Sequence, residues 1–284
     1  MPELVLTLGA LIDEGAARLR RAGIADARRQ AFRLWADLTG RRAGEGFLEP
    51  HIPVGTAAAD DFHRAVARRA LGEPLPHVTG WTGFRRLSLR SDARALIPRP
   101  ETEGLVDLVL ERVPTGRVAD VGTGSGCIAL SLALEGDFAE VVAVDCSAQA
   151  LELARLNREI VGAGVRLIRA DLCVPLRPGA FDALVSNPPY LTAGEYATLD
   201  GSVRDWEPAL ALVSGDDGLG ATTRLLLDGR DVLRPGGWLA LEVDCSRAAI
   251  AARLAGELGW ENVTVQVDLF GRERYLLAQR SDTR

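Results

Sequence analysis

From residue 101 onward, short apolar runs alternate with stretches of helical periodicity, and this alternation limits the possible folds more than any other feature of the chain. Strands are predicted at Arg117–Val121, Val141–Asp145, 165–169, Phe181–Ser186, Trp238–Val243, 262–268 and 274–280. Helices are predicted at 101–112, 125–135, 147–161, 218–233 and 247–258, with a long loop over 187–215. Such alternation predicts a mostly parallel α/β sheet with right-handed crossovers. The last two strands lack an intervening helix, so we expect them to be an antiparallel pair.

The first part of the chain has a different pattern. Apolar residues recur at helical spacing from Leu4 to Leu19, again before Gly40, and from Thr56 to Leu71. We therefore predict a helical-bundle domain at 1–75, a β-hairpin linker at 76–100 and an α/β domain at 101–284. Charge divides in the same way: residues 1–80 hold 11 Arg and 10 acidic residues, and residues 81–284 hold 22 Arg and 29 acidic residues.

Composition excludes several functions. All 33 basic residues are Arg, so no reaction can depend on a lysine amine. The net charge of −6 argues against a basic surface that grips nucleic acid. No apolar run approaches the ~20 residues of a membrane span, and the first residues lack the basic start of a signal peptide. Four widely spaced Cys argue against a structural metal or a disulfide framework and suit a reducing cytoplasm.

A glycine-rich loop, Gly122-Thr123-Gly124-Ser125-Gly126, follows the first predicted strand of the sheet. Glycines at such a position allow a tight turn and a close approach of backbone N–H groups to a ligand. The spacing is one residue shorter than the dinucleotide fingerprint. By itself the loop is also compatible with a plain strand–helix turn.

Two acids and a leucine strengthen the hypothesis of a cofactor site. Asp145 ends the next strand, where a carboxylate can accept two ribose hydroxyls. Asp171, followed by Leu172, ends the third strand, where it can accept a hydrogen bond from an adenine amino group or simply cap a turn. Together these features favour an adenosine-containing cofactor, either NAD or S-adenosylmethionine. The strand count, the reversed last strand and the short glycine loop resemble the class I methyltransferase fold, and this resemblance implies S-adenosylmethionine.

The segment Asn187-Pro188-Pro189-Tyr190 directly follows a predicted buried strand. Each proline fixes its own φ and favours an extended residue before it. The Asn187 side-chain oxygen and the Pro188 carbonyl could then accept both protons of one NH₂ group, while Tyr190 lies against a planar substrate. Such acceptors suit methylation of a conjugated nitrogen, whose lone pair is delocalised and which gains positive charge as the methyl group arrives. A plain proline turn is the alternative.

At this point the chain resembles the bacterial HemK/PrmC family, which methylates the glutamine side-chain nitrogen in the Gly-Gly-Gln loop of class I peptide-chain release factors. The resemblance covers nearly the whole chain. It rests on Leu96-Ile97-Pro98-Arg99-Pro100-Glu101-Thr102-Glu103, Asp120–Gly126, Asp145, Asn187–Tyr190, Trp206-Glu207-Pro208-Ala209-Leu210-Ala211-Leu212, Gly215–Leu219 and Gly271–Arg274. Asn-Pro-Pro-Tyr alone also occurs in nucleobase methyltransferases, whereas the segments at 96–103 and 206–212 are much more specific.

The resemblance implies roles for individual residues. Gly122–Gly126 and Asp145 bind S-adenosylmethionine, and Asp171 with Leu172 lies where family members contact adenine. Asn187 meets both cofactor and substrate, and the stretch to Tyr190 holds the glutamine. Arg99 and Thr102 line the same pocket, although for Arg99 a structural ion pair is an equal alternative. The helical domain helps to dock the release factor.

The sequence departs from the family pattern in two places. Phe84 is followed by Arg85-Arg86, where the family often has a second aromatic residue and a glycine. Asp244-Cys245-Ser246-Arg247 replaces a glycine-rich turn with a glutamine. Two other functions are alternatives. Methylation of a DNA or RNA base would require a basic groove, and a non-catalytic module that senses cofactor or binds release factor would predict a damaged loop. The acidic catalytic part and the intact loop disfavour them.

Overall fold

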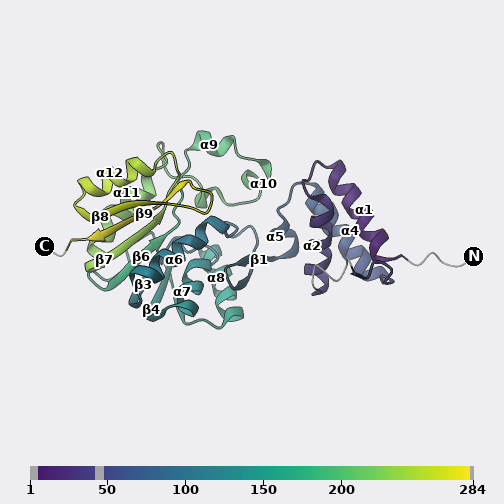
Figure 1. Ribbon diagram of the computed structural model, residues 1–284, viewed down its shortest axis with the longest axis horizontal. Helices are drawn as coiled ribbons and strands as arrows, with labels where there is room; N and C mark the ends of the chain where they lie inside the picture. Colours follow the sequence, from purple (N-terminus) through teal and green to yellow (C-terminus); the bar gives the residue numbers. More distant parts are fainter. Residues whose placement is uncertain (1–5, 42–47, 282–284) are drawn as a thin grey trace, which may run out of the picture. The chain divides into compact units, whose positions relative to one another are not determined.

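The computed structural model describes residues 6–41 and 48–281 (Figure 1). These residues form two compact units. One unit comprises the chain up to Trp81 together with Asp200–Trp206, and the other comprises Thr82–Leu199 together with the chain from Glu207 onward. The chain of the second unit is thus interrupted by a short segment that belongs to the first.

The first unit is helical, as the periodicity predicted. Its helices are α1 (Leu8–Arg21), α2 (Ala27–Thr39), α4 (Thr56–Ala70), α5 (Leu75–Thr79) and, from the later segment, α10 (Gly201–Arg204). Leu11, Trp35 and Phe62 lie in its buried core, where the two aromatic rings meet edge-on with centroids 6.1 Å apart. Gly15 allows this packing because a Cβ there would lie 2.7 Å from the Phe62 ring.

A β-hairpin follows, formed by β1 (Trp81–Phe84) and β2 (Leu87–Arg90). It starts later than the residue 76 that we expected, because Pro74 begins the short helix α5 instead. Arg85, one of the two family departures, lies at the turn with φ of +51°. Its guanidinium pairs with Glu135 at 2.8 Å and Asp107 at 2.7 Å, so the departure anchors the hairpin to two helices of the second unit.

The second unit contains a seven-stranded sheet whose order is β5-β4-β3-β6-β7-β9-β8. β9 is antiparallel to both β7 and β8, and the other pairs are parallel, which confirms the predicted fold class. The strands are β3 (Thr115–Val121), β4 (Asp137–Asp145), β5 (Val165–Arg169), β6 (Phe181–Ser186), β7 (Leu233–Glu242), β8 (Trp260–Val267) and β9 (Glu273–Arg280).

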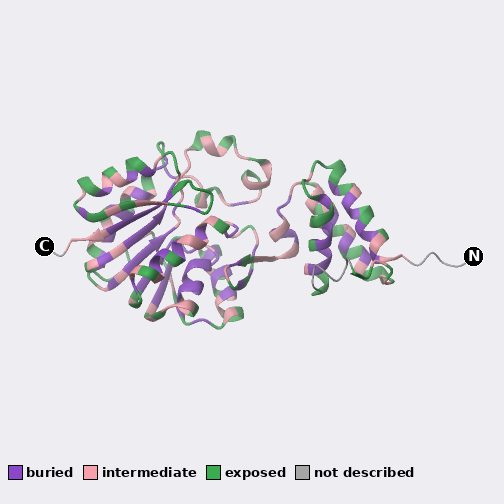
Figure 2. Cartoon of the chain, in the orientation of Figure 1, coloured by how far each residue is buried: buried purple, intermediate pink, exposed green. Residues whose placement is uncertain are grey.

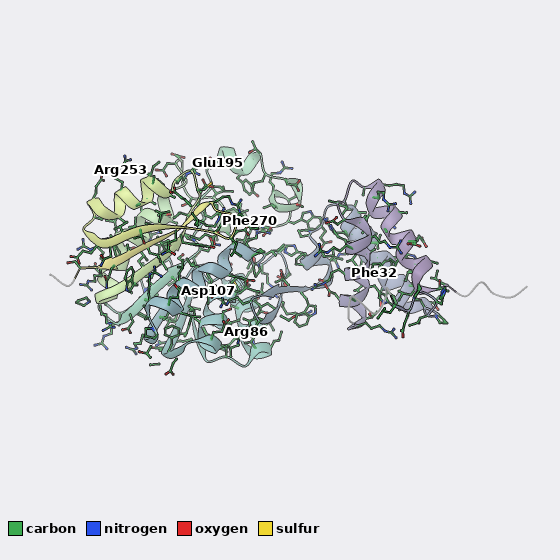
Figure 3. The ribbon with its side chains drawn as sticks, viewed as in Figure 1. Phe32, Arg86, Asp107, Glu195, Arg253 and Phe270 are labelled. Carbon is green, nitrogen blue, oxygen red and sulfur yellow. The ribbon has the colours of Figure 1, made fainter. Side chains whose placement is uncertain are left out.

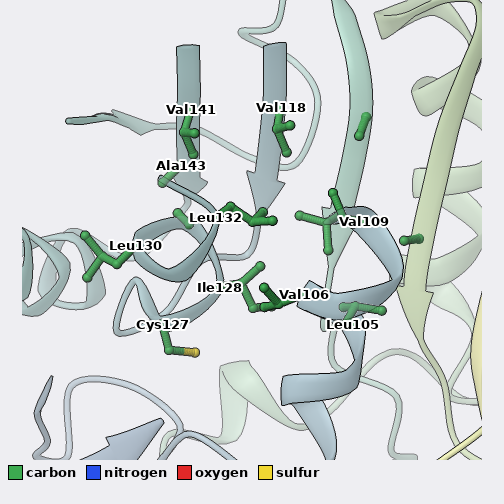
Figure 4. Close-up of a cluster of buried hydrophobic side chains, with 14 of the residues drawn as sticks. Leu105, Val106, Val109, Val118, Cys127, Ile128, Leu130, Leu132, Val141 and Ala143 are labelled. Atoms are coloured by element: carbon green, nitrogen blue, oxygen red, sulfur yellow. The ribbon is translucent and has the colours of Figure 1, made fainter. Parts of the chain in front are cut away.

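Helices cover both faces of this sheet. The helices α6 (Glu103–Arg112), α7 (Cys127–Glu135) and α8 (Ala148–Val161) lie on one face, and α11 (Gly220–Val232) and α12 (Ala248–Glu257) lie on the other. Successive residues of β4 alternate between the two cores: Val141 packs toward α6 and α7 (Figure 4), and Val142 packs toward α11 and α12. A strand buried on both sides needs apolar residues throughout, which explains its continuous apolar run (Figure 2).

Two segments differ from the sequence-based expectation. The predicted loop at 187–215 contains α9 (Ala193–Ala197), α10 and a 3₁₀ turn at Ala209–Ala211. α9 forms because Thr192 and Glu195 make a capping box, which satisfies the exposed N–H groups at its start. β7 begins at Leu233 rather than Trp238, because the turn glycines after Pro235 are absorbed into the strand with a shift in its register against β6.

Candidate active site

A cavity of about 390 Å³ lies at the carboxyl ends of strands β3, β4, β5 and β6. β3 has β4 on one side and β6 on the other, so the chain crosses the sheet in opposite directions from this point. Open α/β sheets bind ligands at such switch points, and the volume falls in the range of small-molecule sites. The sequence-predicted residues that line the cavity are Arg99, Thr102, Gly122, Thr123, Gly124, Ser125, Asp145, Asp171, Leu172, Asn187 and Pro189.

The glycine loop uses most of its own N–H groups. Gly122 and Thr123 donate to the carbonyl of Val144 at 2.8 and 3.0 Å, and Gly124 donates to Oδ2 of Asp145 at 2.9 Å. Gly126 donates to the Thr123 carbonyl, does not line the cavity, and has φ of +86° at the start of α7. These N–H groups are therefore not free to cradle a pyrophosphate, and the loop contributes shape rather than an anion site.

A buried carboxylate fixes this loop from behind. Asp120 is fully buried, and its Oδ2 accepts hydrogen bonds from the Thr123 hydroxyl at 2.6 Å and from the Ala129 N–H at 3.1 Å. Burial raises the pKa of Asp120 to about 7, against which the two hydrogen bonds act. The loop is thus attached to the first turn of α7 through one side chain.

Asp145 lies at the end of β4 with both oxygens directed at backbone donors. Oδ2 accepts from Gly124 and Oδ1 accepts from the Ser147 N–H at 2.9 Å. Each carboxylate oxygen has two lone pairs, so each retains one toward the cavity. Asp145 therefore offers two further acceptors at a fixed position.

Asp171 is placed differently. It is exposed and pairs with Arg224 of α11, whose Nη1 lies 2.8 Å from Oδ2. Leu172, the next residue, has φ of +47°, a conformation that is uncommon for a non-glycine residue. The ion pair occupies part of the carboxylate that was predicted to accept from adenine, and Arg224 itself lines the cavity.

Asn187 is the first residue after β6 and faces the cavity. Its Nδ2 donates to the hydroxyl of Thr102 at 3.1 Å. Pro189 lines the cavity too, whereas Pro188 is buried outside the lining. Tyr190 is half-buried and also outside the lining, and burial raises the pKa of its phenol to about 12. Its backbone N–H donates to the carbonyl of Leu212, which holds the loop against the segment at 209–214.

Arg99 forms the structural ion pair that the sequence left open. Its Nη2 donates to Oε1 of Glu207, while Oε2 of the same carboxylate accepts the Ile97 N–H at 2.9 Å. The Glu207 side chain is 1% exposed. This one acid therefore holds the proline-containing segment that forms a wall of the cavity.

Three side chains that line the cavity or bond to residues lining it were not among the predicted site residues: Glu207, Glu242 and Arg224. Glu207 stood within a quoted family segment, and its position before Pro208 was the only available signal. Glu242 ends β7 with 1% exposure and accepts from the Thr102 hydroxyl at 2.7 Å. A charged residue at the end of an apolar strand was a visible signal for it. Nothing in the sequence marked Arg224.

The second family departure also has a structural role. Arg247 has a side chain that is 11% exposed, and its Nη2 donates to both carboxylate oxygens of Glu195 at 2.9 and 2.8 Å (Glu195 is labelled in Figure 3). Its Nε donates to the Asp217 carbonyl. Arg247 therefore ties α9 and the turn at Asp217 to the segment that follows β7.

Within 6–41 and 48–281, no group of three or more His, Cys, Asp and Glu side chains is arranged to hold a metal ion. In the same residues, no helix combines the length and the apolar character needed to cross a membrane.

Comparison with known proteins assigns this architecture. The sequence model of the PrmC N-terminal domain family matches residues 10–80, and the sequence model of the methyltransferase small domain family matches residues 101–201. The release factor glutamine methyltransferase of Deinococcus radiodurans is 40% identical over 279 residues, covering 97% of this chain and 99% of the relative. That of Moorella thermoacetica is 41% identical over 286 residues, covering 98% and 100%. The chain belongs to the family of release factor glutamine methyltransferases.

Membership of this family confirms the HemK/PrmC resemblance and makes the chain a methyltransferase. The fold agrees. The crystal structure of a methyltransferase from Pyrococcus furiosus matches with a TM-score of 0.53 and 21% identity, covering 68% of this chain and 88% of that chain. Both departures from the family pattern replace expected residues with arginines that form ion pairs within the unit, so they leave the family architecture intact.

Proposed function

We propose that this enzyme transfers a methyl group from S-adenosylmethionine to the side-chain amide nitrogen of the glutamine in the Gly-Gly-Gln loop of class I peptide-chain release factors. The family supplies the reaction type and the release factor. The donor and the roles of individual residues are inferred from the cavity, and the Gly-Gly-Gln loop from the family resemblance of the sequence.

The residues of the cavity fit S-adenosylmethionine better than a dinucleotide. Most N–H groups of the glycine loop already donate to acceptors within the protein, so a pyrophosphate would lack hydrogen-bond donors there. The two remaining acceptor positions of Asp145 suit the two hydroxyls of a ribose. Leu172 and Ile128 offer apolar surface for an adenine ring. When bound, the cofactor supplies an electrophilic methyl group on a positively charged sulfur.

The orientation of the Asn187 amide is the observation that carries the proposal. Its Nδ2 is engaged by Thr102, so Oδ1 is the atom left to act at the cavity. A carbonyl oxygen there accepts an N–H from a substrate amide. That interaction grows stronger as the nitrogen acquires positive charge, so it stabilises the transition state more than the bound substrate. No general base is required, because the proton can leave after the methyl group has been transferred.

The remaining assignments follow from the same scheme. Residues 1–75 dock the release factor, residues 76–100 link the two parts, and residues 101–284 catalyse the transfer. Gly126, Pro188 and Tyr190 act from outside the cavity lining: the glycine shapes the loop, and the two loop residues hold Asn187 and Pro189 in place. Because release factors act in translation, we place the enzyme in the cytoplasm, and because residues 81–284 are acidic, we expect no direct binding of nucleic acid.

The proposal is tested by offering the enzyme S-adenosylmethionine with unmodified release factor and, separately, with nucleic acid, and mapping added methyl groups by mass spectrometry. We expect one methyl group on the Gly-Gly-Gln glutamine. Methylation of a nucleobase with none on that glutamine would refute the assignment.

A pair of variants tests the role of Asn187. Asn187→Ala should lower kcat on the order of 100-fold or more while S-adenosylmethionine affinity stays within about threefold, since removal of one such dipole has effects of that size. Asn262→Ala is the matched control, because that amide donates to Gln279 at an exposed position of β8, outside the cavity lining. Full turnover by Asn187→Ala would contradict the role of the amide.

A further inference from the structure

A line of polar groups runs from Asn187 into the protein, through Thr102, which also lines the cavity, to Glu242, which does not. The Thr102 hydroxyl, on a residue that is 2% exposed, accepts from Asn187 Nδ2 at 3.1 Å and donates to Glu242 Oε2 at 2.7 Å. The other oxygen of Glu242 faces Nη1 of Arg274 at 3.7 Å. Arg274 is fixed in turn, because its Nε donates to Asp268 at 2.9 Å.

The direction of these hydrogen bonds determines which end of the Asn187 amide faces the cavity. A hydroxyl has one proton, and an ionised carboxylate can only accept. Glu242 therefore accepts the hydrogen bond from the Thr102 hydroxyl, and Thr102 presents a lone pair toward Asn187. Only the NH₂ group of the Asn187 amide can donate a hydrogen bond to this lone pair, so the amide oxygen is turned toward the cavity.

Without this line, neither end of the amide would be favoured from behind. The last torsion of an asparagine side chain is broad and roughly two-fold, so the reversed amide is sterically accessible. The neighbouring loop residues cannot substitute, because Pro188 and Pro189 have no N–H and the Ser186 hydroxyl already donates to the Val121 carbonyl. A reversed amide would point its own N–H groups at the N–H of the substrate.

We infer that Thr102 and Glu242 are positioning residues, which hold the Asn187 amide with its oxygen toward the substrate through the hydrogen bonds Asn187–Thr102–Glu242. The inference rests on the proposed function. It reassigns Thr102 from contact with the substrate to control of the residue that makes that contact. It also gives a role to Glu242, which the sequence analysis did not assign.

Variants at Thr102 separate positioning from structure. Thr102→Val keeps the shape of the side chain and removes the hydroxyl, so kcat should fall about tenfold to a hundredfold while S-adenosylmethionine affinity and the KM for release factor stay within about twofold. Thr102→Ser should restore most of kcat. Thr222→Val is the matched control, because this hydroxyl is equally buried, at 1% exposure, and has no hydrogen-bond partner among the described residues.

Glu242→Gln gives a sharper test. Arg274 favours the glutamine oxygen on its own side, which turns the glutamine NH₂ toward Thr102. Thr102 then donates to Asn187 instead of accepting, and the amide reverses. We expect kcat to fall at least as far as in Thr102→Val when both variants are assayed at a temperature where they are folded.

The orientation can also be measured without turnover. Nuclear magnetic resonance of the native enzyme should show one Asn187 side-chain N–H protected from exchange and close to the Thr102 methyl group, assigned by its loss in Asn187→Asp. Both signs should disappear in Glu242→Gln. Native kcat in Thr102→Val and Glu242→Gln, or an unprotected Asn187 amide in the native enzyme, would overturn the inference. A native enzyme that shows the protected amide but leaves the release factor unmethylated would instead overturn the proposed function.

Discussion

Replacement of Glu207 by glutamine should loosen the wall of the cavity that carries Arg99. The native carboxylate accepts two donors, the Ile97 N–H and the Arg99 guanidinium, from a side chain that is 1% exposed. A glutamine has only one oxygen, so it can keep one of these bonds. Its NH₂ group must then face the other donor, which loses its acceptor on this side chain.

The size of the effect follows from these two bonds. Hydrogen bonds to a charged group contribute about 1.5–3 kcal/mol each, and a neutral replacement recovers about 1 kcal/mol. Glu207→Gln should therefore lower the free energy of unfolding by about 2–5 kcal/mol. With an unfolding entropy near 2.1 cal/mol/K per residue, a unit of roughly 200 residues would lose about 5–12 °C in Tm. Affinity for S-adenosylmethionine should fall as well, because segment 94–99 lines the cavity.

Differential scanning calorimetry measures the first effect, and isothermal titration calorimetry measures the second. Glu257→Gln is the control, since that side chain is 66% exposed and only 4.0 Å from Arg253. It should change the free energy of unfolding by less than about 0.5 kcal/mol. If Glu207→Gln unfolded at the native temperature and bound the cofactor normally, the carboxylate would not hold this wall.

Three further outcomes are expected. Asp145→Asn should weaken S-adenosylmethionine binding about tenfold in calorimetric titration, because the new NH₂ group must face the N–H of either Gly124 or Ser147; unchanged affinity would remove Asp145 from the site. Burial raises the pKa of Asp120 to about 7, whereas the same carboxyl group ionises near pH 4 in the unfolded chain. Protonated Asp120 therefore stabilises the folded enzyme fully below about pH 4, and this stabilisation is lost as the pH rises through 7. The fall in stability between pH 5 and pH 8 should thus be about 2–3 kcal/mol larger in the native enzyme than in Asp120→Asn, and equal falls in thermal unfolding would contradict this. Arg85→Met should lower the free energy of unfolding by about 1–3 kcal/mol without changing kcat, because its ion pairs lie in the hairpin anchor rather than the cavity; a loss of kcat at a temperature where the variant is folded would show that the anchor acts on the site.

The sheet and the strand-end residues of the cavity were predictable because they depend on local patterns. Periodicity separates helices from strands, and the missing helix between the last two strands forces their antiparallel pairing. Parallel strands bring their carboxyl ends to one edge, so the loop at Gly122, the acid at Asp145 and the amide at Asn187 had to meet there. Their positions in the sequence determine their position in space.

The supporting side chains were not predictable in this way. Glu207 bonds to a residue 110 positions earlier in the chain, and Glu242 bonds to one 140 positions earlier. No spacing rule connects such residues, because each bond depends on how two separate elements pack. For the same reason the sequence left open whether Arg99 meets substrate or an acid, and only the packing of the segment before α6 against Glu207 decides it.

The charges around the cavity also favour a cationic cofactor. Glu207 and Glu242 face arginines, and Asp171 pairs with Arg224, so most of their charge is balanced within the protein. Asp145 is different: it forms no ion pair with any described residue, and it lies on the cavity with its charge stabilised only by backbone N–H groups. A sulfonium would meet this carboxylate as an opposite charge. Together with a loop whose N–H groups are largely engaged within the protein, this charge supports the proposed choice of S-adenosylmethionine over a dinucleotide.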